Sequence, residues 1–171
     1  NASRTMLFNI NTLTWDDTLL KLFDIPETLL PEVVHSDSCF GSLSELGDIT
    51  IHAVLGDQQA ALFGQGCLEK GQLKSTYGTG CFIMSNVGDE PIHSEDGLLT
   101  TIGFSLNGKV YYAIEGSIYA SGTTVQWLRD NLQFFDKSDQ SEIYLNEDGN
   151  ANNVLFIPVS YTHLTLPTII T

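Results

Sequence analysis

The sequence predicts an α/β fold, and three features of the chain support this prediction. A mostly apolar run with several branched residues at 49–55 predicts a buried strand, and small and apolar residues at 58–65 predict a helix behind it. Two strand-like runs within 98–115 are joined by Asn107 and Gly108, a strong hairpin signal. A long helix is predicted next, at 117–131, and such mixing of strands and helices is typical of α/β domains.

The charge of the chain excludes some classes of partner. Among 171 residues, 21 are acidic and 7 are Lys or Arg, which gives a net charge of −14. Nucleic-acid binding requires a basic patch, so no nucleic-acid partner is expected, and an anionic membrane surface is disfavoured for the same reason. No apolar run is long enough to span a membrane, so no membrane insertion is expected. ATP stays compatible as a ligand, because Mg²⁺ and backbone N–H groups can carry that contact.

The cysteines and histidines predict structural rather than metal-binding roles. Cys39, Cys67 and Cys81 are far apart and form no Cys-x-x-Cys pair, which is typical of reduced thiols and predicts a cytoplasmic location. Cys81 lies in a Gly-rich stretch and is expected to be a small, buried packing residue. The 4 histidines show no metal-ligand spacing.

The remaining elements can be predicted in chain order. Residues 5–10 are apolar enough for a short buried segment. Asp16 and Asp17 mark the start of a helix that ends before Pro26. Residues 36–48 predict a loop around one helical turn. Further elements are predicted downstream: a turn at 66–71, a strand at 81–85, a helix near 138–145 and a strand at 154–158.

Asp57 is the strongest chemical candidate in the chain. It follows the predicted strand at its carboxyl end and begins the predicted helix, and in α/β sheets ligands bind at that edge. A helix N-terminus favours the ionised carboxylate, which can accept a proton or coordinate a metal. The alternative is that Asp57 serves only as the helix N-cap. The residues of this stretch alone leave both interpretations open.

Two Gly-rich stretches are candidates for anion binding. Residues 76–80, Thr-Tyr-Gly-Thr-Gly, have the composition of a phosphate-binding turn, because their glycines let backbone N–H groups approach an oxyanion. Gly116, Ser117 and Gly122 flank the start of the long predicted helix, whose N-terminus is a second candidate. The alternatives are an ordinary β-turn and an ordinary helix start.

Five long motifs stand in order along the chain. They are Asn-Ala-Ser-Arg-Thr-Met-Leu-Phe-Asn-Ile at 1–10, Gly-Asp-Gln-Gln-Ala-Ala-Leu-Phe-Gly-Gln at 56–65, Thr-Tyr-Gly-Thr-Gly-Cys-Phe at 76–82, Glu-Asp-Gly-Leu-Leu-Thr-Thr at 95–101, and Glu115-Gly116-Ser117 with Gln-Trp-Leu-Arg-Asp at 126–130. Together they resemble the FGGY family of carbohydrate kinases, and within it the members that phosphorylate glycerol. The resemblance extends from residue 1 to about 158 and is far more specific than any single Gly-rich turn.

The resemblance implies a ribonuclease-H-like, actin/hexokinase-type fold, in which two α/β domains close over ATP. Residues 1–65 would form the C-terminal part of the first domain, and residues 66–158 the first part of the second. The chain would then be an internal fragment of a longer protein, as its start without Met also indicates. Because half of each site would be missing, the fragment alone is expected to be inactive.

The resemblance also implies roles for individual residues. Asp57 would be the general base that takes the proton from the 3-hydroxyl of glycerol, Gln58 would hydrogen-bond the polyol, and Phe82 would pack on its carbon skeleton. Asp57 would also be a candidate ligand for the Mg²⁺ that arrives with ATP. The residues expected to line the ATP site are Thr79, Gly122 and Gln126.

The implied activity is phosphorylation of glycerol by ATP to glycerol 3-phosphate, in a cytoplasmic enzyme that is a homo-oligomer at full length. Two alternatives stay open: another sugar or polyol kinase of the family, for example one that acts on a pentulose, and a non-catalytic actin-like nucleotide-binding protein. Residues 57–59 and 76–82 favour glycerol. Residues 41–48 lack the Gly-Gly-Thr-Arg loop with which some relatives bind fructose 1,6-bisphosphate, so that regulation is not expected.

The last residues of the chain are interpreted separately. The run Pro-Val-Ser-Tyr-Thr-His-Leu-Thr-Leu-Pro-Thr at 158–168 equals the translation of a transposon-end sequencing adapter preceded by one cytosine. Members of the family would continue there with a Gly-rich, aromatic segment. Residues 159–171 are therefore expected to be a non-native, adapter-derived tail that plays no part in the fold.

Overall fold

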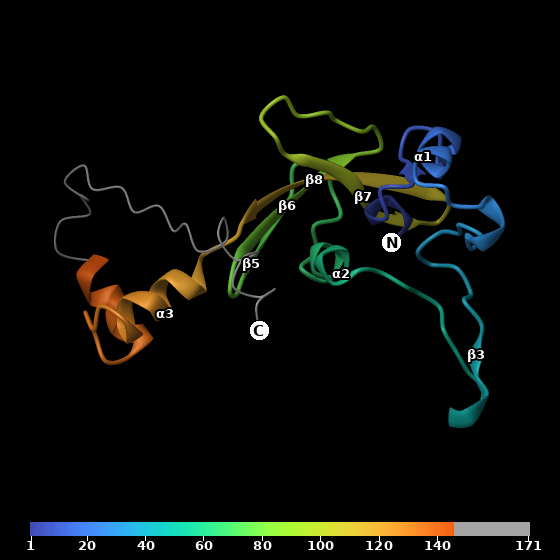
Figure 1. Cartoon of the computed structure of the whole chain (residues 1–171). Helices are drawn as coiled ribbons and strands as arrows, with labels where there is room; N and C mark the ends of the chain where they lie inside the picture. Colours follow the sequence, from blue (N-terminus) through green and yellow to red (C-terminus); the bar gives the residue numbers. More distant parts are fainter. Residues whose placement is uncertain (146–171) are drawn as a thin grey trace. The chain divides into compact units, whose positions relative to one another are not determined.

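The computed structural model describes residues 1–145, and the chain divides into two compact units. The first unit takes Asn1–Ser75 and Ile83–Gly116, and the second takes Thr76–Phe82 and the chain from Ser117 onward (Figure 1). Both helices and strands are present, as the sequence predicts. Across the described residues, no helix combines the length and the apolar content needed to cross a membrane.

The first unit begins with short elements held by local hydrogen bonds. In order, they are η1 (Ala2–Arg4), β1 (Phe8–Asn9), β2 (Thr14–Trp15), α1 (Asp17–Leu22) and η2 (Glu27–Leu29). The Asp16 carboxylate caps α1 by accepting hydrogen bonds from the N–H groups of Thr18 and Leu19. The helix start predicted at Asp16 and Asp17 is confirmed. The predicted buried segment at 5–10 is confirmed only at Phe8, because Thr5 and Met6 are exposed.

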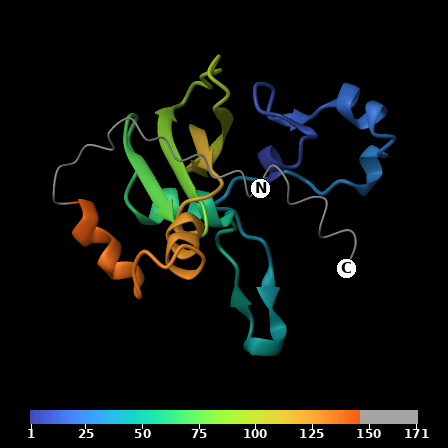
Figure 2. The ribbon, with the colours of Figure 1, turned by 60° about the vertical axis from the view of Figure 1, so that its left-hand side comes forward.

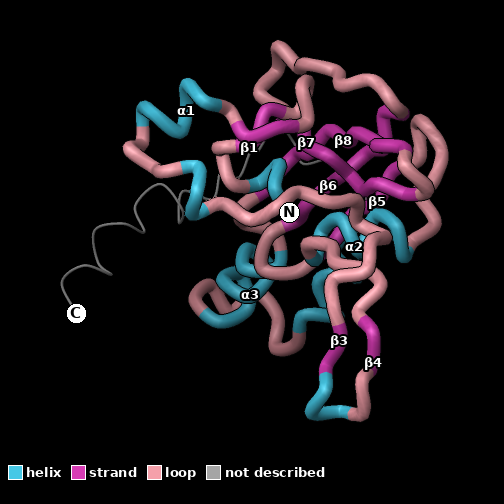
Figure 3. Tube along the Cα trace, turned by 90° about the vertical axis from the view of Figure 1, so that its right-hand side faces the viewer, coloured by secondary structure: helices cyan, strands magenta, loops and turns pink. Residues whose placement is uncertain are grey.

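A two-stranded hairpin projects from the first unit (Figure 3). It consists of β3 (Ser42–Leu43) and β4 (Ile49–Thr50), with the single-turn helix η3 (Ser44–Leu46) at its tip. The prediction of a buried strand at 49–55 is wrong: the strand is two residues long and Ile49 is 55% exposed. Among the described strands, β3 and β4 pair only with each other, so no further strand of a sheet extends the pairing of the apolar run at 49–55. The helical turn predicted within 36–48 is confirmed as η3.

The main sheet has four strands in the spatial order β5-β6-β8-β7. Their bounds are Leu73–Tyr77 for β5, Cys81–Gly88 for β6, Leu99–Leu106 for β7 and Lys109–Ile118 for β8. β7 and β8 form the predicted antiparallel hairpin, which turns at Asn107 and Gly108 with φ angles of 52° and 77°. Two successive positive φ angles are those of a type I′ turn, so the Asn-Gly prediction is confirmed.

Helix α2 (Asp57–Gly64) packs against β7 (Figure 1). The contact lies at Gly103. The register between β7 and β8 shifts at this residue, which marks a β-bulge. A Cβ on Gly103 would lie 3.1 Å from a methyl carbon of Leu62 and 3.3 Å from the carbonyl oxygen of Tyr111. The absence of a side chain at Gly103 therefore lets α2 come close to the sheet.

The core of the first unit forms around this contact. Phe63 of α2 packs edge-to-face on Phe104 of β7, with 5.4 Å between ring centroids. The predicted helix at 58–65 is confirmed, although it begins one residue earlier. The buried residues of the cluster come from α2, the segment after it, and three strands: Leu62, Cys67, Met84, Phe104 and Ala113.

The second unit contains helix α3 (Gly122–Asp130) and the 3-10 helix η4 (Ser138–Leu145), which follow one another along the chain (Figure 2). The long helix was predicted from residue 117, but it begins at Gly122 because β8 continues to Ile118. Arg129 Nη1 donates to the Ser138 hydroxyl at 3.0 Å and ties the two helices together. The strand predicted at 154–158 and the tail predicted at 159–171 lie outside the described residues.

Replacement of Gly103 by valine should destabilise the chain, because the new side chain would occupy the space taken by Leu62. We expect the free energy of unfolding to fall by about 1–3 kcal/mol, as in other overpacked cores. Urea denaturation followed by circular dichroism measures this change.

Gly64→Ala in α2 is the matched control, because a Cβ there meets nothing within 4 Å. Alanine in a helix should leave the stability equal or higher. An unchanged unfolding midpoint for Gly103→Val would contradict the close contact between α2 and β7.

Candidate functional site

Asp57 is the first residue of α2. The N-cap position is taken by Gly56, which has an extended backbone, so Asp57 is not the N-cap of this helix. Its Oδ1 accepts a hydrogen bond from the Gln58 N–H at 2.8 Å, and the residue is exposed. The helix N-terminus stabilises negative charge at this position. Asp57 therefore presents an accessible carboxylate whose orientation is fixed by the first turn of the helix.

The two residues after Asp57, Gln58 and Gln59, are held in place by contacts on the buried side of α2. The Nζ of Lys74, which is only 1% exposed, donates a hydrogen bond to Oε1 of Gln58. Gln59 is buried, and its Oε1 lies 2.9 Å from the place where a Cβ on Gly56 would stand. A side chain at Gly56 would therefore displace Gln59. Sequence analysis missed Lys74, because a single lysine in a short strand-like run carries no pattern that distinguishes a buried from an exposed position.

In the second unit, the loop between β5 and β6 covers the N-terminus of α3. The carbonyl oxygen of Thr79 accepts from the Ser121 N–H at 2.9 Å, and that of Gly78 accepts from the Gly122 N–H at 3.0 Å. The Thr123 hydroxyl also donates to the Thr79 carbonyl, at 3.1 Å. A Cβ on Gly122 would lie 2.4 Å from the Gly78 oxygen, so the contact requires glycine. Loop carbonyls thus engage amides at the helix start that an anion would otherwise use.

The structure brings the predicted ATP-site residues together in the second unit. Thr79 is an exposed residue of the loop, and Gly122 begins the helix that the loop contacts. Gln126 is exposed and lies four residues after Gly122, on the same side of α3. Phe82 is half-buried in β6 of the same unit. The other predicted residues, Asp57 and Gln58, belong to the first unit.

A cation at Asp57 would find few ligands on this chain. Within residues 1–145, no three His, Cys, Asp or Glu side chains are arranged to hold a metal ion. Asp57 can offer one carboxylate, one oxygen of which already accepts a backbone hydrogen bond. This donor set fits Mg²⁺ that is held mainly by nucleotide phosphates, as is usual for this ion.

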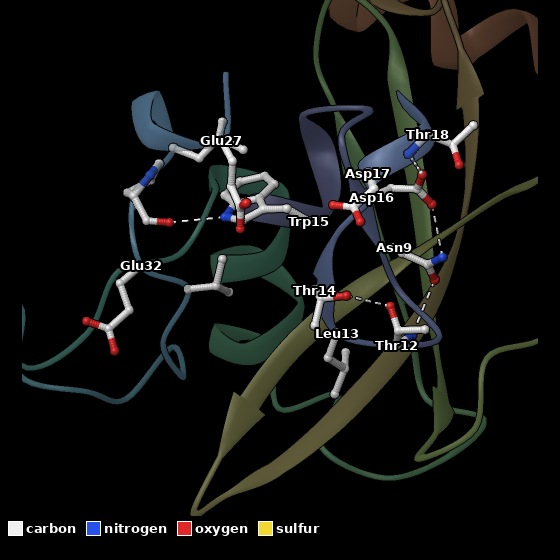
Figure 4. Close-up of a pocket in the computed structure, with 13 residues that line it drawn as sticks. Asn9, Thr12, Leu13, Thr14, Trp15, Asp16, Asp17, Thr18, Glu27 and Glu32 are labelled. Atoms are coloured by element: carbon white, nitrogen blue, oxygen red, sulfur yellow. Dashed lines mark hydrogen bonds between the residues drawn. The ribbon is translucent and has the colours of Figure 1, made fainter. Parts of the chain in front are cut away.

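A separate acidic pocket of about 730 Å³ lies in the first unit around β2 and α1 (Figure 4). Four carboxylates line it: Asp16, Asp17, Glu27 and Glu32. Hydrogen bonds from the Leu19 N–H, the Asn9 amide and the Thr18 N–H lower the pKa of Asp16 below its ordinary value. The pocket contains none of the predicted site residues: Asp16 caps α1, and the other three carboxylates are exposed to solvent.

Comparison with known protein families gives two matches that cover most of the chain. The FGGY family of carbohydrate kinases, N-terminal domain, matches residues 1–64, and the C-terminal domain of the same family matches residues 73–161. The chain belongs to the FGGY family of carbohydrate kinases. The resemblance of the five sequence motifs to this family is therefore confirmed.

Several glycerol kinases of the FGGY family are similar to the chain over most of its length. The glycerol kinase of Natranaerobius thermophilus is 50% identical over 162 residues, which is 92% of this chain. That of Alteromonas mediterranea is 51% identical over 170 residues, or 98% of this chain. The chain spans about a third of the length of these relatives, 32% and 34% respectively.

Solved structures of FGGY kinases share the fold. Plasmodium falciparum glycerol kinase with ADP superposes with a TM-score of 0.78 at 42% identity, covering 84% of this chain and 30% of that one. The xylulose kinase of Lactobacillus acidophilus gives a TM-score of 0.76 at 19% identity, covering 91% of this chain and 33% of that one, and this likeness concerns the fold alone. The expected actin/hexokinase-type α/β fold of the sugar kinases is confirmed.

Alanine at Gly122 should detach the loop at 78–79 from α3, because its Cβ would overlap the Gly78 carbonyl oxygen. The amides of Ser121 and Gly122 would then lose their acceptors. Since one such hydrogen bond contributes about 1 kcal/mol, their hydrogen exchange should become roughly fivefold faster or more, as measured by NMR.

Gly78→Ala on the other side of this contact is the control. A Cβ there would meet nothing closer than 3.9 Å, so exchange at the start of α3 should stay at the wild-type rate. Equal exchange in wild type and Gly122→Ala would show that the loop and the helix are not held in this way.

Proposed function

We propose that this chain is part of an ATP-dependent glycerol kinase, which transfers the γ-phosphoryl group of ATP to glycerol and forms glycerol 3-phosphate. The observation that carries the proposal is the 50% and 51% identity to glycerol kinases across 92% and 98% of the chain. The likeness to a glycerol kinase structure described with ADP supports it. Since the chain spans about a third of such a kinase, we propose that it is inactive without the remaining parts.

In this proposal, Asp57 is the general base. Its Oδ1 is engaged by the Gln58 N–H, which leaves Oδ2 to take the proton from the 3-hydroxyl of glycerol. The oxygen that loses this proton attacks the γ-phosphorus, a new P–O bond forms, and the bond to the leaving oxygen of ADP breaks. Gln58 hydrogen-bonds the polyol, and Phe82 packs on its carbon skeleton.

The ATP site in this proposal uses the second unit. The exposed Thr79 hydroxyl can donate to a phosphate, and the exposed Gln126 carboxamide can hydrogen-bond the nucleotide. Gly122 contributes by holding the loop that carries Thr79 against the start of α3, where a Cβ would overlap the Gly78 carbonyl oxygen. Mg²⁺ bound to ATP supplies charge neutralisation at the phosphates, and Asp57 is its candidate ligand on this chain.

Two other functions are less well supported. Xylulose kinases share the fold at 17–19% identity, well below the 42% identity of the glycerol kinase structure, so a pentulose substrate is not favoured. A non-catalytic nucleotide-binding role is not favoured either. It would not require an accessible carboxylate beside a carboxamide whose oxygen is held by a buried lysine.

We also propose the cellular and structural setting of the complete kinase. A cytoplasmic location is supported by Cys39, Cys67 and Cys81, none of which forms a disulfide within the described part of the chain. The family resemblance supports a homo-oligomer and a domain boundary near residue 65. The adapter-derived origin of residues 159–171 stays a proposal that rests on the sequence.

Asp57→Asn tests the proposed chemistry in the complete kinase, meaning this chain joined to the segments that its relatives carry on either side. Loss of the base should lower turnover by about 10²–10⁴-fold, because general base catalysis contributes that much. The KM for glycerol should change little, since asparagine keeps the size and the polar contacts. A coupled-enzyme assay of ADP formation measures both values.

Asp17→Asn is the matched control, because Asp17 is also an exposed aspartate at the first position of a helix. It should leave turnover unchanged. Undiminished turnover in Asp57→Asn would remove Asp57 as the base.

A further inference from the structure

Lys74 occupies a position that is unusual for a lysine. It lies in β5 between two exposed residues, Leu73 and Ser75, and is itself only 1% exposed. Side chains alternate between the two faces of a strand, so Lys74 points to the covered face. Lysine is rarely buried completely, because removal of its ammonium group from water is costly unless hydrogen bonds replace the lost solvation.

The Lys74 ammonium donates a hydrogen bond to Oε1 of Gln58, across 16 positions of sequence. A lysine ammonium has three donors and no acceptor, so only the oxygen of a carboxamide can face it. The amide group of Gln58 is thereby fixed in one of its two flip states. Its Oε1 is held on the covered side, and its Nε2, with two N–H donors, forms the other end of the carboxamide.

This orientation fixes which groups at the start of α2 accept hydrogen bonds and which donate them. Asp57, when ionised, can only accept hydrogen bonds, whereas Gln58, with its oxygen turned to Lys74, presents an amino group that can only donate. A polyol carries hydroxyl groups that both donate and accept. One hydroxyl can therefore donate to Asp57 while a neighbouring hydroxyl oxygen accepts from Gln58. With the amide reversed, two acceptors would face the polyol, so each contact would use a hydroxyl proton and no group at the start of α2 would donate to a hydroxyl oxygen.

We propose that Lys74 is a positioning residue for the substrate: it holds the Gln58 carboxamide so that its amino group is directed to a hydroxyl oxygen of the polyol. This inference rests on the proposed function, in which Asp57 and Gln58 contact glycerol. Lys74 does not touch the substrate and acts through Gln58.

Lys74→Met in the complete kinase tests the inference, because methionine has a similar length and no donor. The KM for glycerol should rise by about tenfold or more, the usual result of losing a hydrogen bond that a charged group orients. The kcat and the KM for ATP should stay within about twofold, since Gln58 contributes to ground-state and transition-state binding alike. Lys109→Met is the matched control, because Lys109 is an exposed lysine of the same sheet.

A double-mutant cycle with Gln58→Ala distinguishes positioning from a general structural role. Gln58→Ala should itself raise the KM for glycerol, and Lys74→Met should add little on top of it, because the group that it positions is gone. A fall in kcat together with a rise in both KM values, or additive effects in the double variant, would overturn the inference.

Gln58→Glu keeps the inference testable if Lys74→Met does not fold. The carboxylate keeps an oxygen for Lys74 but replaces the amino group by a second oxygen, so the KM for glycerol should again rise by about tenfold or more. An unchanged KM in Gln58→Glu would overturn the inference.

The failure of the inference can be distinguished from the failure of the proposed function. If Gln58→Ala leaves the KM for glycerol unchanged, the proposed polyol contact itself fails. If Gln58→Ala raises the KM while Lys74→Met leaves it unchanged, only the role of Lys74 fails.

Discussion

The contact between Leu62 and the bulge at Gly103 is the constraint on which the first unit depends. Helix α2 has 8 residues, too few to be stable in water without tertiary packing. Its position is therefore set by Leu62, which is completely buried and packs over Gly103, the one residue of β7 that has no side chain. The same contact sets where α2 begins, and hence where its first two side chains are presented.

Several local contacts at the start of α2 keep those side chains in place. Gly56 leaves room for the buried Gln59, the Gln58 N–H holds one oxygen of Asp57, and Lys74 holds the oxygen of Gln58. The second unit uses a comparable arrangement, because Gly122 lets the loop at 78–79 contact the first amides of α3. Phosphoryl transfer demands mainly positioning and charge compensation from a protein, and rigid helix starts suit that task.

The features that sequence predicts well are those with a local cause. Asn107 and Gly108 form the hairpin turn because positive φ angles suit these residue types, and Asp16 caps α1 through bonds to its own neighbours. The run at 49–55 failed as a buried strand because burial requires a partner surface, which composition does not encode. Lys74 was missed for the same reason, since its ammonium group is paired with Gln58, 16 residues away in the sequence. The roles proposed for Asp57 and Gln58 rest on the order of the motifs, not on local geometry.

The most direct measurement is a neutron crystal structure of the complete kinase with glycerol and a non-hydrolysable ATP analogue, because neutrons distinguish the amide hydrogens of Gln58 from its oxygen. If Asp57 is the general base, one of its oxygens should lie about 2.6–3.2 Å from a terminal hydroxyl oxygen of glycerol. The Gln58 amino group should donate to a neighbouring hydroxyl while its oxygen accepts from Lys74. Glycerol bound away from the start of α2, or a Gln58 oxygen turned towards it, would contradict these roles.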